Sequence, residues 1–385
     1  MLHHSRRQFV QSMLAATALL LPRLALAQQR QVLTIAGTGI AGYEAEGSSG
    51  LIAIRTPINN PYGVVIGPDS ALYFCEVDSG RMRRLELASN RLTTIAGTGE
   101  KGFSAQGQRA LQTPFSAPHE IRFDEQGNLY VVERDAHAVR RIAAGTGLVT
   151  LVAGTGRAGF SGDGGPSVLA ELRQPHSIAF DSQGNLLICD IGNGRIRSVS
   201  RATGVISTLA GTGENSPTPD NGAMSSSALL GPRSLDTDRD GNAYLVLREG
   251  NAIYRLDLAA DRLQRIAGTG AKGYSGDGGA AIDATFNGPK GIAYSSEDNS
   301  LYIVDTENHV IRRLALSTGM IDTVLGTGER ADGADGDPLR CQLNRPHGVF
   351  VARRGYVINV RGFPKGLDGP KQPLGTLCIT PCGLW

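Results

Sequence analysis

Short apolar runs alternate with turns rich in glycine, asparagine and aspartate along most of the chain. One stretch shows the pattern clearly, because four apolar runs follow one another at 175–180, 184–190, 195–197 and 204–210. Each run has the length of a strand, and the Gly and Asn residues between runs tolerate the positive φ that a tight hairpin requires. No stretch within these units has helical periodicity. The pattern therefore predicts units of four antiparallel strands.

The unit repeats with a fixed period. Six positions lie 57 residues apart, and each directly follows a proline: Tyr62, His119, His176, Arg233, Lys290 and His347. An Ala-Gly-Thr-Gly element keeps nearly the same period: it begins at Ala36, Ala96, Ala153, Ala210 and Ala267 and returns as Leu325-Gly326-Thr327-Gly328. A fixed period that occurs six times indicates six copies of one structural unit.

A single sheet of this size cannot bury both of its faces, whereas sheets stacked around an axis cover one another. We therefore predict an all-β fold, a six-bladed β-propeller with four-stranded antiparallel blades over residues 31–352. In such a ring the residue after each proline begins the strand nearest the axis. The six post-proline residues would then line the mouth of the central channel.

Four elements recur in order along the chain: Pro-x-Gly, Gly-Asn-Leu-Tyr, Asp-x-x-Asn-x-x-Ile-Arg and Ala-Gly-Thr-Gly. In this combination the chain resembles NHL-repeat proteins from residue 32 to about residue 352. The resemblance implies a propeller of the NHL type. It also implies that residues 32–35 supply the outer strand of the last blade, so that both chain ends close the ring.

The last unit departs from the pattern. After Ala352 the expected Gly-Asn turn and Asn-x-x-Ile-Arg element are missing, and a Pro/Gly-rich stretch runs to Trp385. Residues 356–360 could still form a strand. We treat 353–385 as a divergent C-terminal tail, and one hypothesis is that it is out of frame, which would leave the sixth blade incomplete and its sheet edge exposed.

Residues 1–27 have the pattern of an export signal rather than of the fold. Ser5-Arg6-Arg7-Gln8-Phe9 precedes an apolar run from Met13 to Leu21, and Ala25-Leu26-Ala27 forms a small-residue cleavage site. The apolar run is too short to span a bilayer as a helix. The paired arginines resemble a twin-arginine signal, with an ordinary Sec signal as the alternative. We expect a bacterial protein that is periplasmic or secreted.

Net charge limits the partners that the chain is expected to bind, and the cysteine count limits the disulfides it can form. The whole chain carries 38 basic and 36 acidic residues, so removal of three arginines with residues 1–27 leaves 35 against 36. A near-neutral chain without a Lys/Arg tract predicts no nucleic-acid or membrane partner, and we expect a monomer. Among five cysteines, Cys75 and Cys189 read as small buried apolar residues, and a bridge between Cys378 and Cys382 stays open.

Three of the six post-proline residues are histidines, and three neutral imidazoles that converge on an axis could bind Zn²⁺ and leave an open position for water or substrate. The Pro-His element also resembles peptidyl-α-hydroxyglycine amidating lyase, a related propeller in which such histidines hold zinc. That resemblance implies His119, His176 and His347 as ligands. In that family the ligands come from alternate blades, whereas these come from blades two, three and six, and its catalytic tyrosine motif has no clear match.

Three functions are left open. We expect a module that binds a small polar ligand, peptide or glycan at the channel mouth. The alternative is a metal-dependent lyase or hydrolase, amidating-lyase-like or gluconolactonase-like, in which Arg233 or Lys290 holds an anionic group and Tyr62 transfers a proton. The third is a scaffold that binds proteins over its broad face. Virginiamycin B lyase is comparable at the level of the fold.

Two further sets of residues recur and are expected to be structural. An acid ends the second strand of most units, and an arginine follows it: Glu76, Glu133, Asp190 and Asp305, with Arg84, Arg141, Arg197, Arg255 and Arg313. Buried charges usually need such partners. The Ser-Gly-Asp-Gly-Gly segments at 161–165 and 275–279 have too few oxygen ligands for Ca²⁺, so we expect inter-blade turns.

Overall fold

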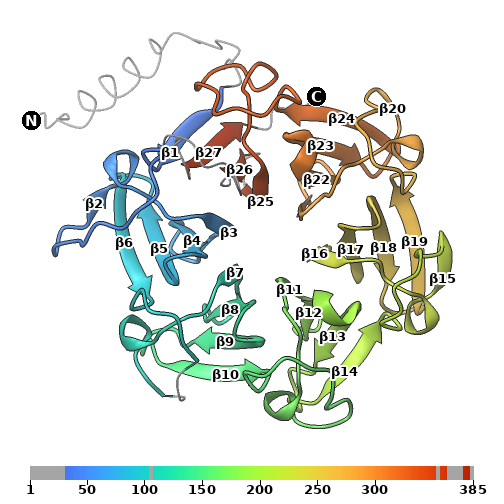
Figure 1. The fold of residues 1–385 in the computed structure, drawn as a ribbon, viewed down its shortest axis with the longest axis horizontal. Coiled ribbons are helices and arrows are strands. Elements are labelled where there is room, and N and C mark those ends of the chain that lie inside the picture. Colours follow the sequence, from blue (N-terminus) through green and yellow to red (C-terminus); the bar gives the residue numbers. More distant parts are fainter. Residues whose placement is uncertain (1–30, 104–106, 353–355, 362–375, 382–385) are drawn as a thin grey trace, which may run out of the picture.

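The described strands form six antiparallel sheets arranged around a central opening (Figure 1). The structure is a computed structural model that describes residues 31–103, 107–352, 356–361 and 376–381. Residues 1–27 and Cys382 lie outside these ranges, so the predicted signal and the Cys378–Cys382 bridge are not part of the described structure. Within the described ranges, no helix is long and apolar enough to cross a membrane.

Five of the sheets, here called blades one to five, are each built from one continuous stretch of chain. Blade one contains β2 (Leu51–Ile52), β3 (Pro61–Ile66), β4 (Leu72–Glu76), β5 (Arg81–Glu86) and β6 (Arg91–Ala96). Blade two contains β7 (Pro118–Phe123), β8 (Leu129–Glu133), β9 (Ala138–Ile142) and β10 (Val149–Ala153). Blade three contains β11 (Ser177–Phe180), β12 (Leu186–Asp190), β13 (Arg195–Val199) and β14 (Ile206–Ala210).

Blades four and five complete this series. Blade four contains β15 (Asn221–Ala223), β16 (Pro232–Thr237), β17 (Asn242–Leu247), β18 (Ala252–Asp257) and β19 (Arg262–Ala267). Blade five contains β20 (Gly279–Ala280), β21 (Gly291–Ser295), β22 (Ser300–Asp305), β23 (Val310–Ala315) and β24 (Met320–Leu325). Short 3-10 turns join the elements: η1 (Ala53–Arg55), η2 (Ala110–Gln112), η3 (Ser167–Leu169), η4 (Ile191–Asn193), η5 (Met224–Ser226), η6 (Ala281–Asp283) and η7 (Thr306–Asn308).

The remaining sheet, here called the closing sheet, joins the two ends of the described chain. Its order is β1 (Leu33–Ala36), β27 (Thr376–Pro381), β26 (Tyr356–Arg361) and β25 (Pro346–Ala352). The prediction that the N-terminal segment supplies the outer strand is confirmed, because β1 pairs with β27.

The predicted fold class is wrong in the number and make-up of its blades. The all-β propeller is correct, but the structure does not consist of six equal four-stranded blades with an incomplete last one. Only five blades are continuous units, and three of these have a fifth, outermost strand. The closing sheet is a composite of both chain ends and has four strands. The physical reason is that a sheet edge left open by the divergent segment can still be paired by any extended chain, because strand pairing uses backbone groups.

The innermost strands surround the axis and contact one another around the ring: β3, β7, β11, β16, β21 and β25. They approach so closely that glycine is required at two positions beside the channel. A Cβ added to Gly63 would lie 2.7 Å from Glu120 Cα, and one added to Gly291 would lie 2.7 Å from the carbonyl oxygen of His347. The recurrent glycine of the Pro-x-Gly motif therefore permits neighbouring backbones to approach closely.

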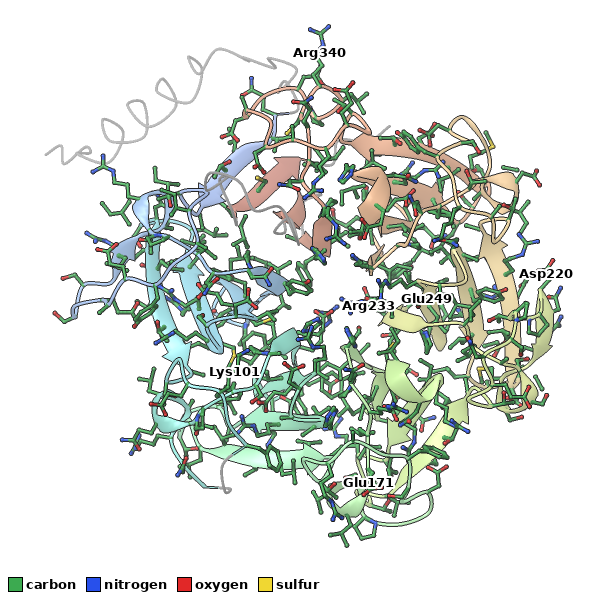
Figure 2. The ribbon with its side chains drawn as sticks, in the orientation of Figure 1. Lys101, Glu171, Asp220, Arg233, Glu249 and Arg340 are labelled. Carbon is green, nitrogen blue, oxygen red and sulfur yellow. The ribbon has the colours of Figure 1, made fainter. Side chains whose placement is uncertain are left out.

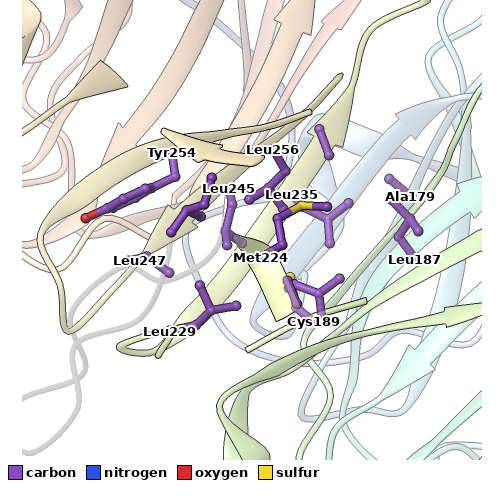
Figure 3. Packing of buried hydrophobic residues seen from close by; sticks show 14 of the residues in the cluster. Ala179, Leu187, Cys189, Met224, Leu229, Leu235, Leu245, Leu247, Tyr254 and Leu256 are labelled. Atoms are coloured by element: carbon purple, nitrogen blue, oxygen red, sulfur yellow. The ribbon is translucent and has the colours of Figure 1, made fainter. Parts of the chain in front are cut away.

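Apolar side chains fill the spaces between neighbouring sheets rather than one central core. Figure 3 shows the layer between blades three and four, where Leu187 and Cys189 face Leu235 and Leu245. All four side chains are fully or almost fully buried. This confirms Cys189 as a small buried residue, and Cys75 is equally buried in the layer between blades one and two. Each sheet thus depends on both of its neighbours for burial.

The recurrent acids are buried and paired, as expected, but mostly with other arginines than predicted. Glu76 pairs with Arg83 at 3.2 Å and not with Arg84, which binds Asp69 instead. Side chains alternate between the faces of a strand, and Glu76 lies opposite Arg81 in the ladder, so Arg83 shares its face. The pairs of blades two, three and five follow this rule: Glu133–Arg140, Asp190–Arg197 and Asp305–Arg312. In blade four Leu247 and Tyr254 replace the two members.

The Ser-Gly-Asp-Gly-Gly loops confirm their predicted structural role. Asp163 accepts a hydrogen bond from buried Arg197 at 2.6 Å, and Asp277 accepts one from buried Arg312 at 2.7 Å. Each loop therefore supplies a second carboxylate to an arginine that is inaccessible to water. The acids also hold the backbone that leads to the inner strand of their own blade, since the Asp190 carboxylate accepts a hydrogen bond from Arg173 N–H at 2.7 Å.

A side chain in one blade fixes the start of the inner strand in the next. His309, at φ 58°, accepts the N–H of Arg345 at its Nδ1 over 3.2 Å, and His137 does the same for Gln174 over 3.0 Å. The Asn251 side-chain oxygen accepts the N–H of Gly288 over 2.9 Å. These inter-blade bonds explain why His137 and His309 recur, and they require a neutral imidazole.

We expect His309→Ala to lower the free energy of unfolding by about 1 kcal/mol, because the Arg345 N–H loses its acceptor. His309→Asn should retain stability, since Asn251 makes the same bond in blade four. Burial lowers the pKa of His309, so the folded state resists protonation at a pH where the unfolded chain is protonated. The stability that His309 contributes is therefore present above its ordinary pKa of about 6.5 and is lost as pH falls below it.

Urea unfolding at about pH 7.5 and about pH 5.5 measures both the stability change in each variant and its dependence on pH. The loss of stability on acidification should be smaller in His309→Asn than in the wild-type protein. Equal stability of the Ala and Asn variants would contradict the proposed bond.

Candidate ligand-binding site at the channel mouth

A local backbone pattern presents the six post-proline residues at the channel mouth. Two residues before each of them the backbone has positive φ: Asn60 (53°), Ala117 (51°), Gln174 (50°), Gly231 (73°), Gly288 (54°) and Arg345 (45°). Four of the ring residues then lie where the register of the inner strand shifts against the second strand: Tyr62, His119, Arg233 and His347. Such irregularities turn a side chain away from the regular ladder. The predicted positions therefore converge on one place.

Aromatic and imidazole rings form a continuous arc along one side of the mouth. The Tyr62 ring centre lies 4.6 Å from that of His119 and 4.3 Å from that of His347. The His119 ring in turn lies 4.6 Å from that of His176, edge to face. Arg233 and Lys290 occupy the remaining positions, and both are buried. The mouth thus has an uncharged planar side and a cationic side.

The histidines of the arc are neutral. Burial first, and then the neighbouring Arg233, lowers the pKa of His176 well below its ordinary value. Burial and His176 do the same to the pKa of His119, and burial and Lys290 to that of His347. His176 Nδ1 lies 2.7 Å from the carbonyl oxygen of Gln174. Because a carbonyl only accepts, Nδ1 carries the proton and Nε2 is left as a hydrogen-bond acceptor.

The arrangement does not fit the predicted zinc site. Tyr62 lies between His119 and His347, so the three histidines do not converge on one point. Among the described residues, no group of three or more His, Cys, Asp or Glu side chains is placed to hold a metal ion. The reason is the order of the sheets: blade one stands between blade two and the closing sheet and contributes a tyrosine to the arc.

Arg233 is the most unusual charge of the mouth. Its side chain lies beside the central opening in Figure 2, and the residue is 6% exposed. Burial lowers its pKa to about 10. Among the described residues no carboxylate lies at ion-pairing distance from its guanidinium, since the nearby Glu120 binds Arg122. A buried cation without an acid is costly and is seldom retained unless something else binds it.

Lys290 is held differently from its neighbour Arg233. Its Nζ donates to Glu307 at 2.9 Å, and the same carboxylate accepts from Arg345 at 2.6 Å. Burial lowers the pKa of Lys290 to about 8. Burial alone would raise the pKa of Glu307, but the hydrogen bonds from Arg345 and Lys290 bring it to about 2. This group leaves one net positive charge near Arg233.

A cavity of about 640 Å³ opens beside His176, between blades three and four. It is lined by Arg134 and Arg248 and by loop residues that include Glu214 and Asn215. Sequence reasoning missed both arginines. Their signal was present, since each directly follows the second strand of its blade, 114 residues (two periods) apart.

Two family models match parts of the chain. The Teneurin NHL domain model matches residues 100–200, and the NHL repeat model matches residues 286–314. Human NHL repeat-containing protein 2 is 24% identical over 299 residues, which cover 70% of this chain and 41% of that protein. These matches support an NHL-type propeller. The chain spans less than half the length of the curated relatives that it matches.

Solved structures share the fold at low identity. An auxiliary nutrient binding protein from Bacteroides thetaiotaomicron has a TM-score of 0.62 at 14% identity, over 91% of this chain and 76% of that chain. A streptogramin B lyase structure has a TM-score of 0.51 at 16% identity, over 86% and 96% of the two chains. Binding proteins and enzymes are thus built on this propeller, and the fold alone does not decide between them.

We expect Arg233→Met to raise the free energy of unfolding by about 1 kcal/mol or more, because an unpaired buried cation is replaced by an apolar side chain of similar length. Denaturant unfolding of the two proteins measures the change. Arg262→Ala, on the exposed face of β19, is the control and should leave stability unchanged. A loss of stability in Arg233→Met would mean that the fold itself needs the guanidinium.

Proposed function

We propose that this NHL-type propeller is a binding module that takes a small polar ligand with an anionic group at the channel mouth. The observation that carries the proposal is Arg233, a buried guanidinium without an acidic partner among the described residues. A planar guanidinium matches a carboxylate with two parallel hydrogen bonds. In a desolvated site such a charge-assisted contact is strong, which gives a physical reason to keep the cation.

The surroundings of Arg233 support an organic anion rather than a bare inorganic one. The Tyr62 and histidine rings offer flat apolar faces on the opposite side of the mouth. Neutral imidazoles add no charge, so the attraction comes from Arg233 and from the net positive Lys290–Glu307–Arg345 group. A ligand with a carboxylate at one end and a planar or polar body would use both sides. The proposal contains no catalytic step.

We expect benzoate, as a simple organic carboxylate, to bind the wild-type protein at about pH 7 in isothermal titration calorimetry. Arg233→Met should weaken this binding roughly tenfold or more, since a hydrogen bond to a charged group contributes about 1.5–3 kcal/mol. Affinity should also fall as pH rises through the Lys290 pKa of about 8, because that ammonium loses its charge.

Arg262→Ala is again the matched control, because it removes an arginine far from the mouth. Absence of benzoate binding by the wild-type protein, or equal binding by Arg233→Met, would refute the anion site. Since Arg233→Met is expected to be at least as stable as the wild-type protein, unfolding would not explain a loss.

We also propose that residues 1–27 direct export by the twin-arginine route. The pattern that supports it is Arg6-Arg7 before Phe9, followed by the apolar run and Ala25-Leu26-Ala27. We expect mature protein that begins near Gln28 in the periplasmic or secreted fraction. Substitution of Arg6 and Arg7 by lysine should leave the precursor in the cytoplasm. Export of that variant would favour the Sec route, and wild-type protein retained with residues 1–27 intact would contradict export.

A further inference from the structure

We propose that the ligand is a saccharide with one terminal carboxylate, whose acid end binds Arg233, whose hydroxyls donate to the histidine arc, and whose neutral end fills the cavity between blades three and four. The inference rests on the proposed function and narrows its ligand class. Three observations carry it: the acceptor state of His176, the cavity beside it and the balance of charge around that cavity.

The first observation is the direction of hydrogen bonding at the mouth. His176 Nδ1 is committed to the Gln174 carbonyl at 2.7 Å, and His119 Nδ1 lies 3.4 Å from the Ala117 carbonyl. Their Nε2 atoms are therefore acceptors. A simple carboxylate offers acceptors only and cannot pair with them. A ligand that satisfies Arg233 and these nitrogens needs an anionic group and O–H or N–H donors a short distance away, as in a sugar acid.

The second observation is the volume and position of the cavity beside His176. The cavity beside His176 has a volume of about 640 Å³, within the range of about 300–1,000 Å³ that is usual for small-molecule sites. Gly231 lines it directly before Pro232 and Arg233, so the cavity adjoins the anion site along the chain. A ligand anchored at Arg233 therefore has room for a further ring beyond His176.

Loop residues that lead into blade four line part of the cavity. Glu214 and Asn215 directly follow Gly213 and line the cavity with that residue. The counterpart of Asp163 in this loop is Asp220, which lies 57 residues further along and binds Arg265 at 2.7 Å. Blade four therefore keeps the loop carboxylate, and the cavity is lined by residues that precede it.

The third observation is charge, which argues that the remainder of the ligand is neutral. Two cations and three acids line the cavity: Arg134, Arg248, Asp135, Glu214 and Glu249. Because His176 is neutral, the net formal charge of the side chains that line the cavity is 2 − 3 = −1. Arg248 also binds Glu249 at 3.1 Å, and Arg134 binds Asp135 at 2.6 Å. A second anionic group would not be attracted here, whereas hydroxyls can pair with these polar side chains in either direction.

Lactobionate is a suitable probe, because it joins one carboxylate to a neutral galactose. Calorimetric titrations of the full chain would compare it with lactose, which lacks the acid, and benzoate, which lacks the hydroxyls. We expect lactobionate to bind at least roughly tenfold more tightly than either, since one further good polar contact is worth about a factor of ten. Two variants locate the contacts: His176→Phe removes the acceptor but keeps a ring, and Asn215→Trp fills the cavity.

In both variants the ratio of lactobionate affinity to benzoate affinity should fall to roughly a third or less of the wild-type ratio. Arg262→Ala is the control for both, and thermal unfolding verifies that each variant is folded. If benzoate binds through Arg233 but lactobionate binds no more tightly, the saccharide inference is overturned and the proposed anion site stands. If His176→Phe and Asn215→Trp keep the full preference, the placement in the cavity is overturned. If no anion binds, the proposed function itself fails.

Discussion

Close contact between neighbouring inner strands is the constraint on which the rest of this propeller depends. The backbones of β3 and β7 pass so near each other that Gly63 has no space for a Cβ beside Glu120. Every inner strand contacts the next, so the ring is continuous around the axis. The inter-blade bonds from His137, Asn251 and His309 fix the backbone where three of these strands begin, since each holds the residue two positions before a ring position.

The same constraint creates the site. A residue with positive φ, a proline and an irregular register follow one another at the start of the inner strands, so side chains there point into the mouth instead of the inter-sheet core. Desolvation at this crowded position keeps the histidines neutral. It also leaves the buried Arg233, which has no carboxylate at ion-pairing distance among the described residues, suited to bind an anion. The close approach of the inner strands thus determines both where the ring side chains point and how burial shifts their pKa values.

Most other buried charges serve the fold. The acids at the ends of the second strands bind arginines of the third strand, and they accept backbone N–H groups just before the inner strand of the same blade. Blade four is the exception, with Leu247 and Tyr254 in place of the pair. Arg248 and Glu249, which directly follow Leu247, line the cavity beside His176.

Period and turn chemistry determined much of this protein from the sequence. The 57-residue spacing located the six ring residues, and the Gly-Asn turns and apolar runs defined antiparallel strands, because these signals are local and repeat. They did not determine which arginine faces each acid. A shift of one residue, Arg83 against Arg84, changes the face of the strand, and a repeated motif does not carry that register.

Only the tertiary structure decided the rest, since it depends on which segments become neighbours in space. The NHL resemblance predicted the outer strand at residues 32–35, but only the structure shows that this strand pairs with β27, more than 340 positions away, in a four-stranded closing sheet. The order of the sheets placed Tyr62 between His119 and His347, an arrangement that the repeat period alone does not reveal. It also left Arg233 buried without an acid among the described residues, and this is a property of the surroundings rather than of the residue.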